Sequence, residues 1–177
     1  MSLSLRYSGM TDCIIPDAIN RTNFYNSFRD LSNLQRFKLP NRATDLDFVA
    51  YNCASLVEGF CGESTTSMRY GYYNCKNLKT AVCGNSVIDM YAAYDTCVNL
   101  IGKAACGPNV INMGQAYRNC GNLTTAACGN NVVNMYHAYY NCANLTGKAA
   151  CGPNVIDMSY AYEHCGNLET AVCGCQV

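Results

Sequence analysis

The chain has 177 residues, a length that suits one domain and is short for two. Twelve Lys and Arg residues balance 12 Asp and Glu residues, so the formal net charge is zero. This balance excludes the strongly basic surface on which nucleic-acid binding and polybasic membrane anchoring depend. The 14 cysteines lie at the edge of the content typical of secreted, disulfide-rich scaffolds.

The N-terminal residues 1–9 lack the cationic region and long apolar stretch of a secretory signal peptide. No segment approaches the roughly 18 consecutive apolar residues that cross a bilayer, so we expect no membrane insertion. These features predict that the chain folds in a reducing compartment, where cysteines stay as thiols.

An internal repeat covers most of the chain. A methionine recurs every 22 or 23 residues, and the string GKAACGPNVI occurs at 102–111 and again at 147–156. Two cysteines follow each methionine, and the interval between them alternates between 8 and 9 residues along the chain. The sequence unit is therefore a pair of coils of 45 residues. The methionines are Met68, Met90, Met113, Met135 and Met158.

The repeat predicts a solenoid, because a coil of this length cannot bury its apolar face without stacking on its neighbours. Residues 1–23 do not fit the repeat, and we expect them to form an N-terminal cap. Residues 24–177 form the solenoid as a single domain of about seven coils of 22–23 residues. The coils start near residues 24, 46, 68, 90, 113, 135 and 158.

Each coil contains two kinds of predicted element. The pattern M-x-x-A-Y-x-x-C spaces apolar residues three and four apart, which predicts one short helical or 3₁₀ turn. The segment before the second cysteine predicts one short parallel strand, with Ala81 and Cys83 inward and Thr80 and Val82 outward. The following glycine suits the sharp turn that ends the strand. The expected strands are Lys79–Cys83, Lys103–Cys106, Thr124–Cys128, Lys148–Cys151 and Glu169–Cys173.

The unit M-x-x-A-Y-x-N-C-x-N-L-x-x-x-A-C-G-x-N-V resembles the BspA-type leucine-rich repeat of bacterial surface proteins. One coil fills the positions of that repeat with Ala93, Tyr94, Cys97, Leu100 and Cys106. The sequence pattern N-V-I-D-M-x-x-A-Y also resembles patterns in tail and virion proteins of phages and prophages from gut bacteria. The resemblance implies a leucine-rich-repeat-like fold.

The resemblance also implies a non-enzymatic structural or binding role. We expect a phage or prophage virion component, such as a tail, fibre or capsid-decorating protein, assembled in the host cytoplasm. Its partner would be a protein or a host-surface carbohydrate. The alternative is a bacterial cell-surface adhesion module, and a remoter one is an injected effector or enzyme.

The cysteines read as core residues. Twelve of the 14 lie on two columns of the repeat, in which Leu31 and Leu39 occupy the same positions one coil earlier. Neighbours in a column would be about 4.8 Å apart, a poor match to disulfide geometry. Cys173 and Cys175 are the only close pair, so we predict no metal site and no cofactor, and Cys175 is the candidate exposed thiol.

An asparagine follows the first cysteine of each coil by two residues. We expect these amides to form a buried ladder that bonds the backbone of the next coil. Asn20, Asn122 and Asn144 also match glycosylation acceptors, but the ladder explains the coils that lack the threonine. The ladder residues are Asn77, Asn99, Asn122, Asn144 and Asn167.

Tyrosines form a further column, which we place in the core: Tyr72, Tyr94, Tyr117, Tyr139 and Tyr162. The tyrosines beside it are expected to be exposed, and they are candidates for carbohydrate or protein contacts. His137 and His164 are the only histidines, and no Ser or Asp accompanies them in a recognisable catalytic arrangement. We therefore predict no catalytic residue.

The outward strand positions predict a flat, mildly basic binding face, in which Thr and Lys alternate beside small apolar residues. A protein partner or a second copy of the solenoid could dock there, and a solvated sheet face is the alternative. The uncapped C-terminal end is a second predicted docking surface, because an open coil exposes core and strand edge. The candidate face comprises Lys38, Phe60, Thr80, Val82, Lys103, Ala105, Thr125, Ala127, Lys148, Ala150, Thr170 and Val172.

Overall fold

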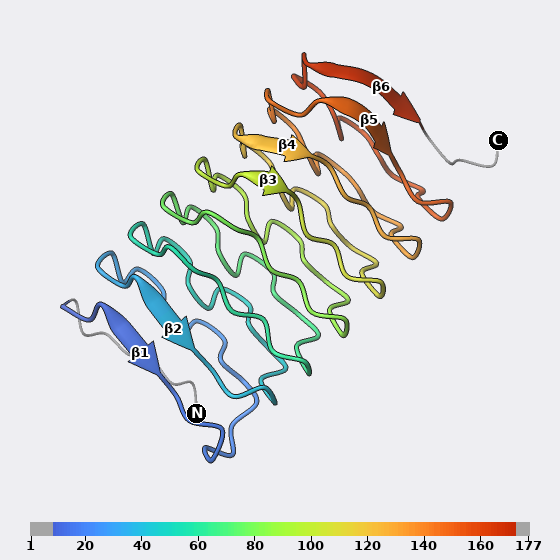
Figure 1. The fold of residues 1–177 in the computed structure, drawn as a ribbon. Coiled ribbons are helices and arrows are strands. Elements are labelled where there is room, and N and C mark those ends of the chain that lie inside the picture. The colour runs from blue at the N-terminus through green and yellow to red at the C-terminus, as the bar shows by residue number, and fades with distance from the viewer. Residues whose placement is uncertain (1–8, 173–177) are drawn as a thin grey trace.

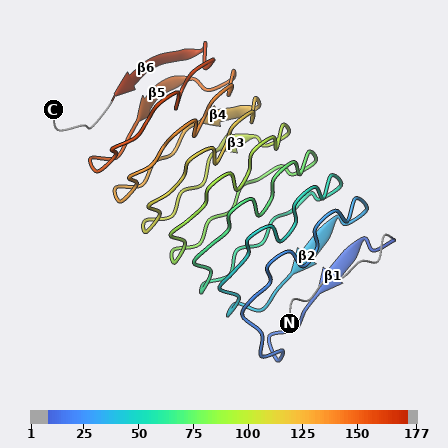
Figure 2. The same cartoon turned by 180° about the vertical axis from the view of Figure 1, so that it is seen from behind.

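A computed structural model describes residues 9–172. The chain winds into a row of stacked coils, with short strands along one wall of the row (Figure 1). Turns and loops make up the opposite wall (Figure 2). We call these two sides the strand wall and the turn wall.

The strand wall contains six short strands within the described residues, and they pair in parallel as three two-stranded sheets. Each sheet joins one coil to the next, as a solenoid requires. The first strand lies in the segment predicted as a cap, so the stacking extends into that segment. The pairs are β1 (Asp12–Ile14) with β2 (Arg36–Lys38), β3 (Gly102–Lys103) with β4 (Leu123–Thr125), and β5 (Gly147–Ala150) with β6 (Leu168–Val172).

A second line of contacts runs along the row with one residue from each repeat. Isolated parallel bridges begin between Asn23 and Asp45 and continue at intervals of 22 or 23 residues. This spacing matches that of the methionines, so the coils stack in register. The later members of the line are Ser67, Asp89, Asn112, Asn134 and Asp157.

The segment predicted as a helical or 3₁₀ turn forms a run of turns instead. Tyr70 and Asn74 have φ values of 52° and 59°, which a right-handed helix cannot contain. Alternate N–H groups bond to the next coil, as Tyr70 N–H does to the Tyr91 carbonyl at 2.9 Å. These inter-coil bonds replace the i→i−4 bonds of a helix. Residues 9–172 accordingly hold no helix of the length and apolarity that a bilayer crossing needs.

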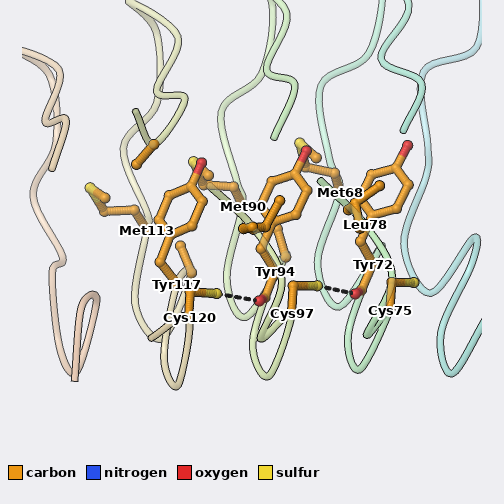
Figure 3. Close-up of a cluster of buried hydrophobic side chains, with 14 of the residues drawn as sticks. Met68, Tyr72, Cys75, Leu78, Met90, Tyr94, Cys97, Met113, Tyr117 and Cys120 are labelled. Carbon is orange, nitrogen blue, oxygen red and sulfur yellow. Dashed lines mark hydrogen bonds between the residues drawn. The ribbon is translucent and has the colours of Figure 1, made fainter. Parts of the chain in front are cut away.

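The core lies between the two walls and contains residues of the columns that the repeat predicts to be buried. Tyr72, Tyr94, Tyr117 and Tyr139 are fully buried, and their rings stack with centroids 5.2 to 5.4 Å apart. Methionines and first-column cysteines line the same core (Figure 3). The placement of these four tyrosines in the core is therefore as the sequence predicts, and Tyr162 is partly buried.

The buried tyrosines explain why the strands differ from their predicted bounds. The Tyr94 hydroxyl accepts the Val82 N–H at 3.0 Å and donates to the Val82 carbonyl. Tyr117 bonds Ala105 in the same way. The N–H groups of Val82 and Ala105 are then not available to pair with a neighbouring strand. The expected strand Lys79–Cys83 is therefore wrong, and the described wall has no strand between β2 and β3.

The other strand predictions fit unevenly. The strands expected at Lys103–Cys106 and Thr124–Cys128 are replaced by β3 and β4, which end at Lys103 and Thr125. Farther along, β5 and β6 overlap Lys148–Cys151 and Glu169–Cys173 closely, although Cys173 lies outside the described residues. The strand prediction holds best at the last two coils.

The glycine after each second cysteine serves close stacking. A Cβ on Gly107 would lie 2.5 Å from the Gly84 carbonyl oxygen, and one on Gly152 would lie 2.4 Å from that of Gly129. Neither glycine is among the residues with positive φ. The approach of successive coils therefore requires these glycines, whereas the sequence had suggested a sharp turn.

Candidate binding surfaces

Both cysteine columns tie neighbouring coils together through the core. The Cys97 thiol donates to the Tyr72 carbonyl at 2.9 Å, and the next coil repeats this contact (Figure 3). In the second column, Cys83 Sγ accepts the Gly107 N–H at 3.2 Å. Burial raises the pKa of Cys83 to about 12, so this thiol is neutral and unreactive at neutral pH.

All twelve cysteines of the described residues are free thiols. All of them except Cys13 lie in the two columns, where bonds between the thiols and backbone groups give the cysteines a structural role. Cys173 and Cys175, including the predicted exposed thiol, lie outside the described residues.

The histidines lie among aromatic rings of the turn wall. The His137 ring stacks on Tyr136 with centroids 4.2 Å apart, and His164 meets Tyr140 edge to face at 5.2 Å. Within residues 9–172, no three His, Cys, Asp or Glu side chains gather closely enough to hold a metal ion. The surroundings of both histidines therefore suit packing and contact.

The predicted asparagine ladder lies at the surface. The side-chain amides of Asn122 and Asn167 are exposed, and each donates at 2.9 Å to a carbonyl of the preceding coil. Asn144 donates to the side chain of Asn122 at 3.3 Å. Asn77 reaches the preceding coil through its backbone N–H, and Asn99 is half-buried. The expected burial and the direction toward the next coil are therefore wrong for this column.

Sequence reasoning missed a more regular polar column directly before the methionines. Asp89 Oδ1 accepts the N–H of Tyr91 at 2.9 Å, and Asn134 Oδ1 accepts that of Tyr136 at 2.8 Å. These are Asx-turns, which hold the chain at the line of inter-coil bridges. The signal was present, because an Asp or Asn precedes most of the repeat-initiating residues.

The predicted binding face on the strand wall splits into two columns of different exposure. One column is an exposed ridge in which Thr and Lys alternate: Thr80, Lys103, Thr125, Lys148 and Thr170. In the other column, Phe60, Val82, Ala105 and Ala127 are partly buried, whereas Lys38, Ala150 and Val172 are exposed. The three separate sheets also break the flat, continuous surface that the sequence predicted. The uncapped end at 173–177 lies outside the described residues.

The turn wall gathers several of the tyrosines that the sequence placed outside the core. The rings of Phe48 and Tyr70 stack with centroids 4.9 Å apart, and those of Tyr51 and Tyr73 with centroids 4.7 Å apart. The two stacks lie side by side, with centroids 5.8 Å apart from Phe48 to Tyr51 and 6.0 Å from Tyr70 to Tyr73. All four side chains are half-buried. We call these four residues the aromatic grid.

Two arginines border the aromatic grid. The Arg29 guanidinium lies 4.6 Å from the centroid of the Tyr51 ring. Arg69 lies 5.6 Å from the centroid of Tyr91, whose ring meets Tyr70 edge to face at 5.5 Å. Tyr and Arg are the residue types enriched in the hot spots of protein interfaces.

A polar stretch separates the aromatic grid from a second group of rings. The buried Asp95 carboxylate accepts bonds from Arg118 Nε and from the Thr96 hydroxyl, both at 2.9 Å. Burial raises the pKa of Asp95, and the Arg118 charge opposes that rise. Beyond this pair lies the histidine cluster, which we define as Tyr136, His137, Tyr140, Tyr160 and His164.

Comparisons with known proteins agree with this fold. The family model of the BspA type leucine rich repeat region matches residues 4–102, with 6 copies. Among solved structures, a T. pallidum leucine rich repeat protein (TpLRR) superposes with a TM-score of 0.72 at 17% identity, over 89% of this chain and 80% of that one. At this identity the likeness shows the fold alone. Among curated proteins, none matches the chain significantly.

Proposed function

Because the chain belongs to the BspA-type leucine-rich repeat family, we propose that it is a non-enzymatic repeat module that binds a protein partner. Repeat proteins of this kind generally mediate protein contacts, and stacked coils supply the extended surface that such contacts use. The proposal needs no cofactor and no catalytic residue.

One observation carries the proposal: the core side chains recur from coil to coil, whereas one position on the turn wall holds a different side chain in most coils. The residue two after the methionine position has positive φ in every coil, between 52° and 58°. Its side chain changes from coil to coil, whereas the tyrosine that follows two positions later stays buried in the middle coils. Ala92 is buried and Tyr160 is exposed at this position, and the other members are half-buried. A rigid scaffold that presents a different side chain in each coil suits selective binding. The variable residues are Asn26, Phe48, Tyr70, Ala92, Gln115, His137 and Tyr160.

Two finer assignments belong to this proposal, one for the division of the chain and one for its biological setting. The solenoid has about seven coils in residues 24–177, after a cap at 1–23. The module is a phage or prophage virion component assembled in the host cytoplasm, and a bacterial cell-surface adhesion module is the alternative. The neutral buried thiols favour a reducing compartment during folding, which supports the first setting.

Imaging separates the two settings. Antibody-gold labelling of purified particles and of whole cells from the source should place the protein on particles. Gold on the cell envelope, with unlabelled particles, would support adhesion and contradict the virion assignment.

Site-specific photo-crosslinking tests the binding function itself. A photoreactive residue at Thr80 probes the strand wall, one at Tyr70 probes the aromatic grid, and one at Gln115 probes the turn wall outside the grid. We expect one adduct of defined mass from one wall, in the native source. An adduct of twice the chain mass would identify a second copy as the partner. If no position on either wall gives an adduct, the binding function is wrong.

A further inference from the structure

We propose that the aromatic grid, with Arg29 and Arg69 at its borders, docks a protein segment that combines apolar side chains with carboxylates. The inference rests on the proposed binding function, and it assigns that function to the turn wall and to a partner chemistry. It goes beyond the strand-wall face that the sequence suggests.

The aromatic grid points away from the strand wall. Tyr72 lies directly before Tyr73 in the chain, and its side chain crosses the core to meet the Phe60 N–H at 2.7 Å. Tyr72 is fully buried, whereas Tyr70 and Tyr73 on the same segment remain half-exposed. The grid is therefore a surface of its own, separate from the Lys and Thr ridge.

Folding of the coil does not explain two of the rings. Phe48 and Tyr70 have φ values of 55° and 52°, in the left-handed region that is unfavourable for a bulky residue. The same position holds Ala92 and Gln115 at 52° and 56° in later coils. The backbone therefore adopts this conformation without an aromatic side chain at the position. Ring stacking offsets part of the cost, so a test must separate stability from binding.

The arginines supply the charge complementarity. Arg29 reaches Asp30 through one nitrogen at 3.3 Å, and Arg69 reaches Asp89 through one nitrogen at 3.4 Å. Both contacts are longer than the roughly 2.7–2.9 Å of a strong charge-assisted bond. The planar fork of a guanidinium is better matched by a carboxylate that binds two of its nitrogens. A partner carboxylate at either border would make that contact.

The ring arrangement favours a protein over a carbohydrate. A sugar packs its apolar side on an open ring face, but in each stack of the grid one ring face covers the other at 4.7 or 4.9 Å. Arg29 also lies over the Tyr51 ring, and Tyr25 and Tyr91 meet Phe48 and Tyr70 edge to face. Packed, amphipathic rings of this kind suit apolar side chains and backbone groups of a protein segment.

Selection from a random dodecapeptide display library against the full chain tests this inference. We expect the selected peptides to combine Asp or Glu with apolar residues. A variant with Phe48→Gln and Tyr70→Ala should bind a selected peptide at least about tenfold more weakly, as loss of hot-spot residues does. A variant with Arg29→Gln and Arg69→Gln should bind it more weakly and lose most of the salt dependence.

The matched control applies the same changes at the same coil position outside the grid. His137→Gln with Tyr160→Ala should leave peptide binding within about twofold of the unchanged chain. Equal melting midpoints of both variants would show that the grid residues act in binding and not in folding.

Several results would overturn the inference. The selection could yield no binding peptide, or peptides without carboxylates. The variant with Phe48→Gln and Tyr70→Ala could bind a selected peptide as tightly as the unchanged chain does. A panel of soluble oligosaccharides could bind more tightly than the peptides. Peptide binding that is lost with Thr80→Ala and Lys103→Ala would overturn it too, but would leave the proposed binding function standing on the strand wall. The photo-crosslinking experiment judges that function independently.

Discussion

At the scale of single residues, the buried tyrosine hydroxyl is the group that connects the two walls. One hydroxyl can accept and donate at once, so it satisfies both the N–H and the carbonyl of a single backbone residue. Tyr94 does this for Val82, and Tyr139 for Ala127. Each tyrosine thereby fixes the distance between the turn wall and the strand wall of the preceding coil.

Replacing Tyr94 by Phe should lower the free energy of unfolding by about 1–3 kcal/mol, because it leaves two backbone groups of Val82 without a partner in the core. Urea unfolding followed by circular dichroism measures the change. Tyr160→Phe is the matched control, since Tyr160 is exposed and should change stability by less than about 0.5 kcal/mol. Equal effects of the two substitutions would contradict the structural role of the buried hydroxyl.

The buried thiols make stability depend on pH in the alkaline range. Burial raises the pKa of Cys53 and Cys83 to about 12 and that of Cys106 to about 11, from an ordinary value of 9.0. Between these values the unfolded chain has lost protons that the folded chain still holds. The stabilisation is therefore complete below pH 9 and is lost as the pH rises through the folded pKa.

We expect the urea midpoint to be constant from neutral pH to about pH 8.5 and then to fall. Each such cysteine contributes a slope of up to about 1.4 kcal/mol per pH unit. A variant with Cys53→Ala and Cys83→Ala should start from a lower stability and show a shallower alkaline slope. A midpoint that stays unchanged up to about pH 10.5 would show that the thiols are not buried as described.

At the scale of the coil, the sequence predicts which residues are inside better than it predicts the backbone conformation. Repeat spacing alone places Met90, Tyr94 and Cys97 in the core, where the structure has them. Helix and strand assignments fail because they depend on partners that spacing does not reveal. The turn at Tyr70 bonds the next coil, and the backbone at Val82 bonds a tyrosine hydroxyl.

For the candidate site, too, the sequence predicts the position of residues better than it predicts their contacts. Sequence reasoning expected Tyr70 and Tyr73 to be exposed, whereas the structure has them half-buried. Repeat spacing could not show that these residues meet rings of another coil as a grid. The asparagine column at Asn122 was chosen because it recurs in successive coils. The Asp and Asn residues of the Asx-turns before the methionines recur as often, so recurrence could not distinguish the two columns. Recurrence identifies a column, whereas its bonding depends on the direction in which each side chain points.

The glycine column limits how closely the coils stack. Gly107→Ala should destabilise the chain by more than about 2 kcal/mol, because the new Cβ would meet the Gly84 carbonyl oxygen at 2.5 Å. Gly121→Ala is the control in the next coil, since nothing lies within 4 Å of a Cβ there. Thermal unfolding of both variants tests the difference. Comparable midpoints would mean that the coils can separate at little cost.

At the scale of the whole molecule, stability is a sum over neighbouring coils, because each coil bonds only the coils before and after it. Net charge is zero, so long-range repulsion does not set a preferred length. A pair of coils should therefore be removable without loss of the fold, provided that the cut keeps every column in register.

Deletion of residues 68–112, one 45-residue unit, should give a shorter chain that folds cooperatively. Tyr117 would then take the place of Tyr72 and reach Phe60, and Cys120 would take the place of Cys75 and reach the Ala50 carbonyl. Urea unfolding should show one transition with an m-value lowered in proportion to the surface removed. Deletion of residues 68–107 shifts every later column out of register, so this control should fail to fold.

The same deletion separates the fold from the proposed site. Gln115 and Arg118 would replace Tyr70 and Tyr73 beside Phe48 and Tyr51, so both stacks of the aromatic grid would lose a ring. A folded deletion variant should therefore lose affinity for the selected acidic peptides while its unfolding stays cooperative. A variant that folds and still binds would place the partner elsewhere. One that fails to fold would show that the coils are not interchangeable units, because stacking in register would then not be enough to hold the core.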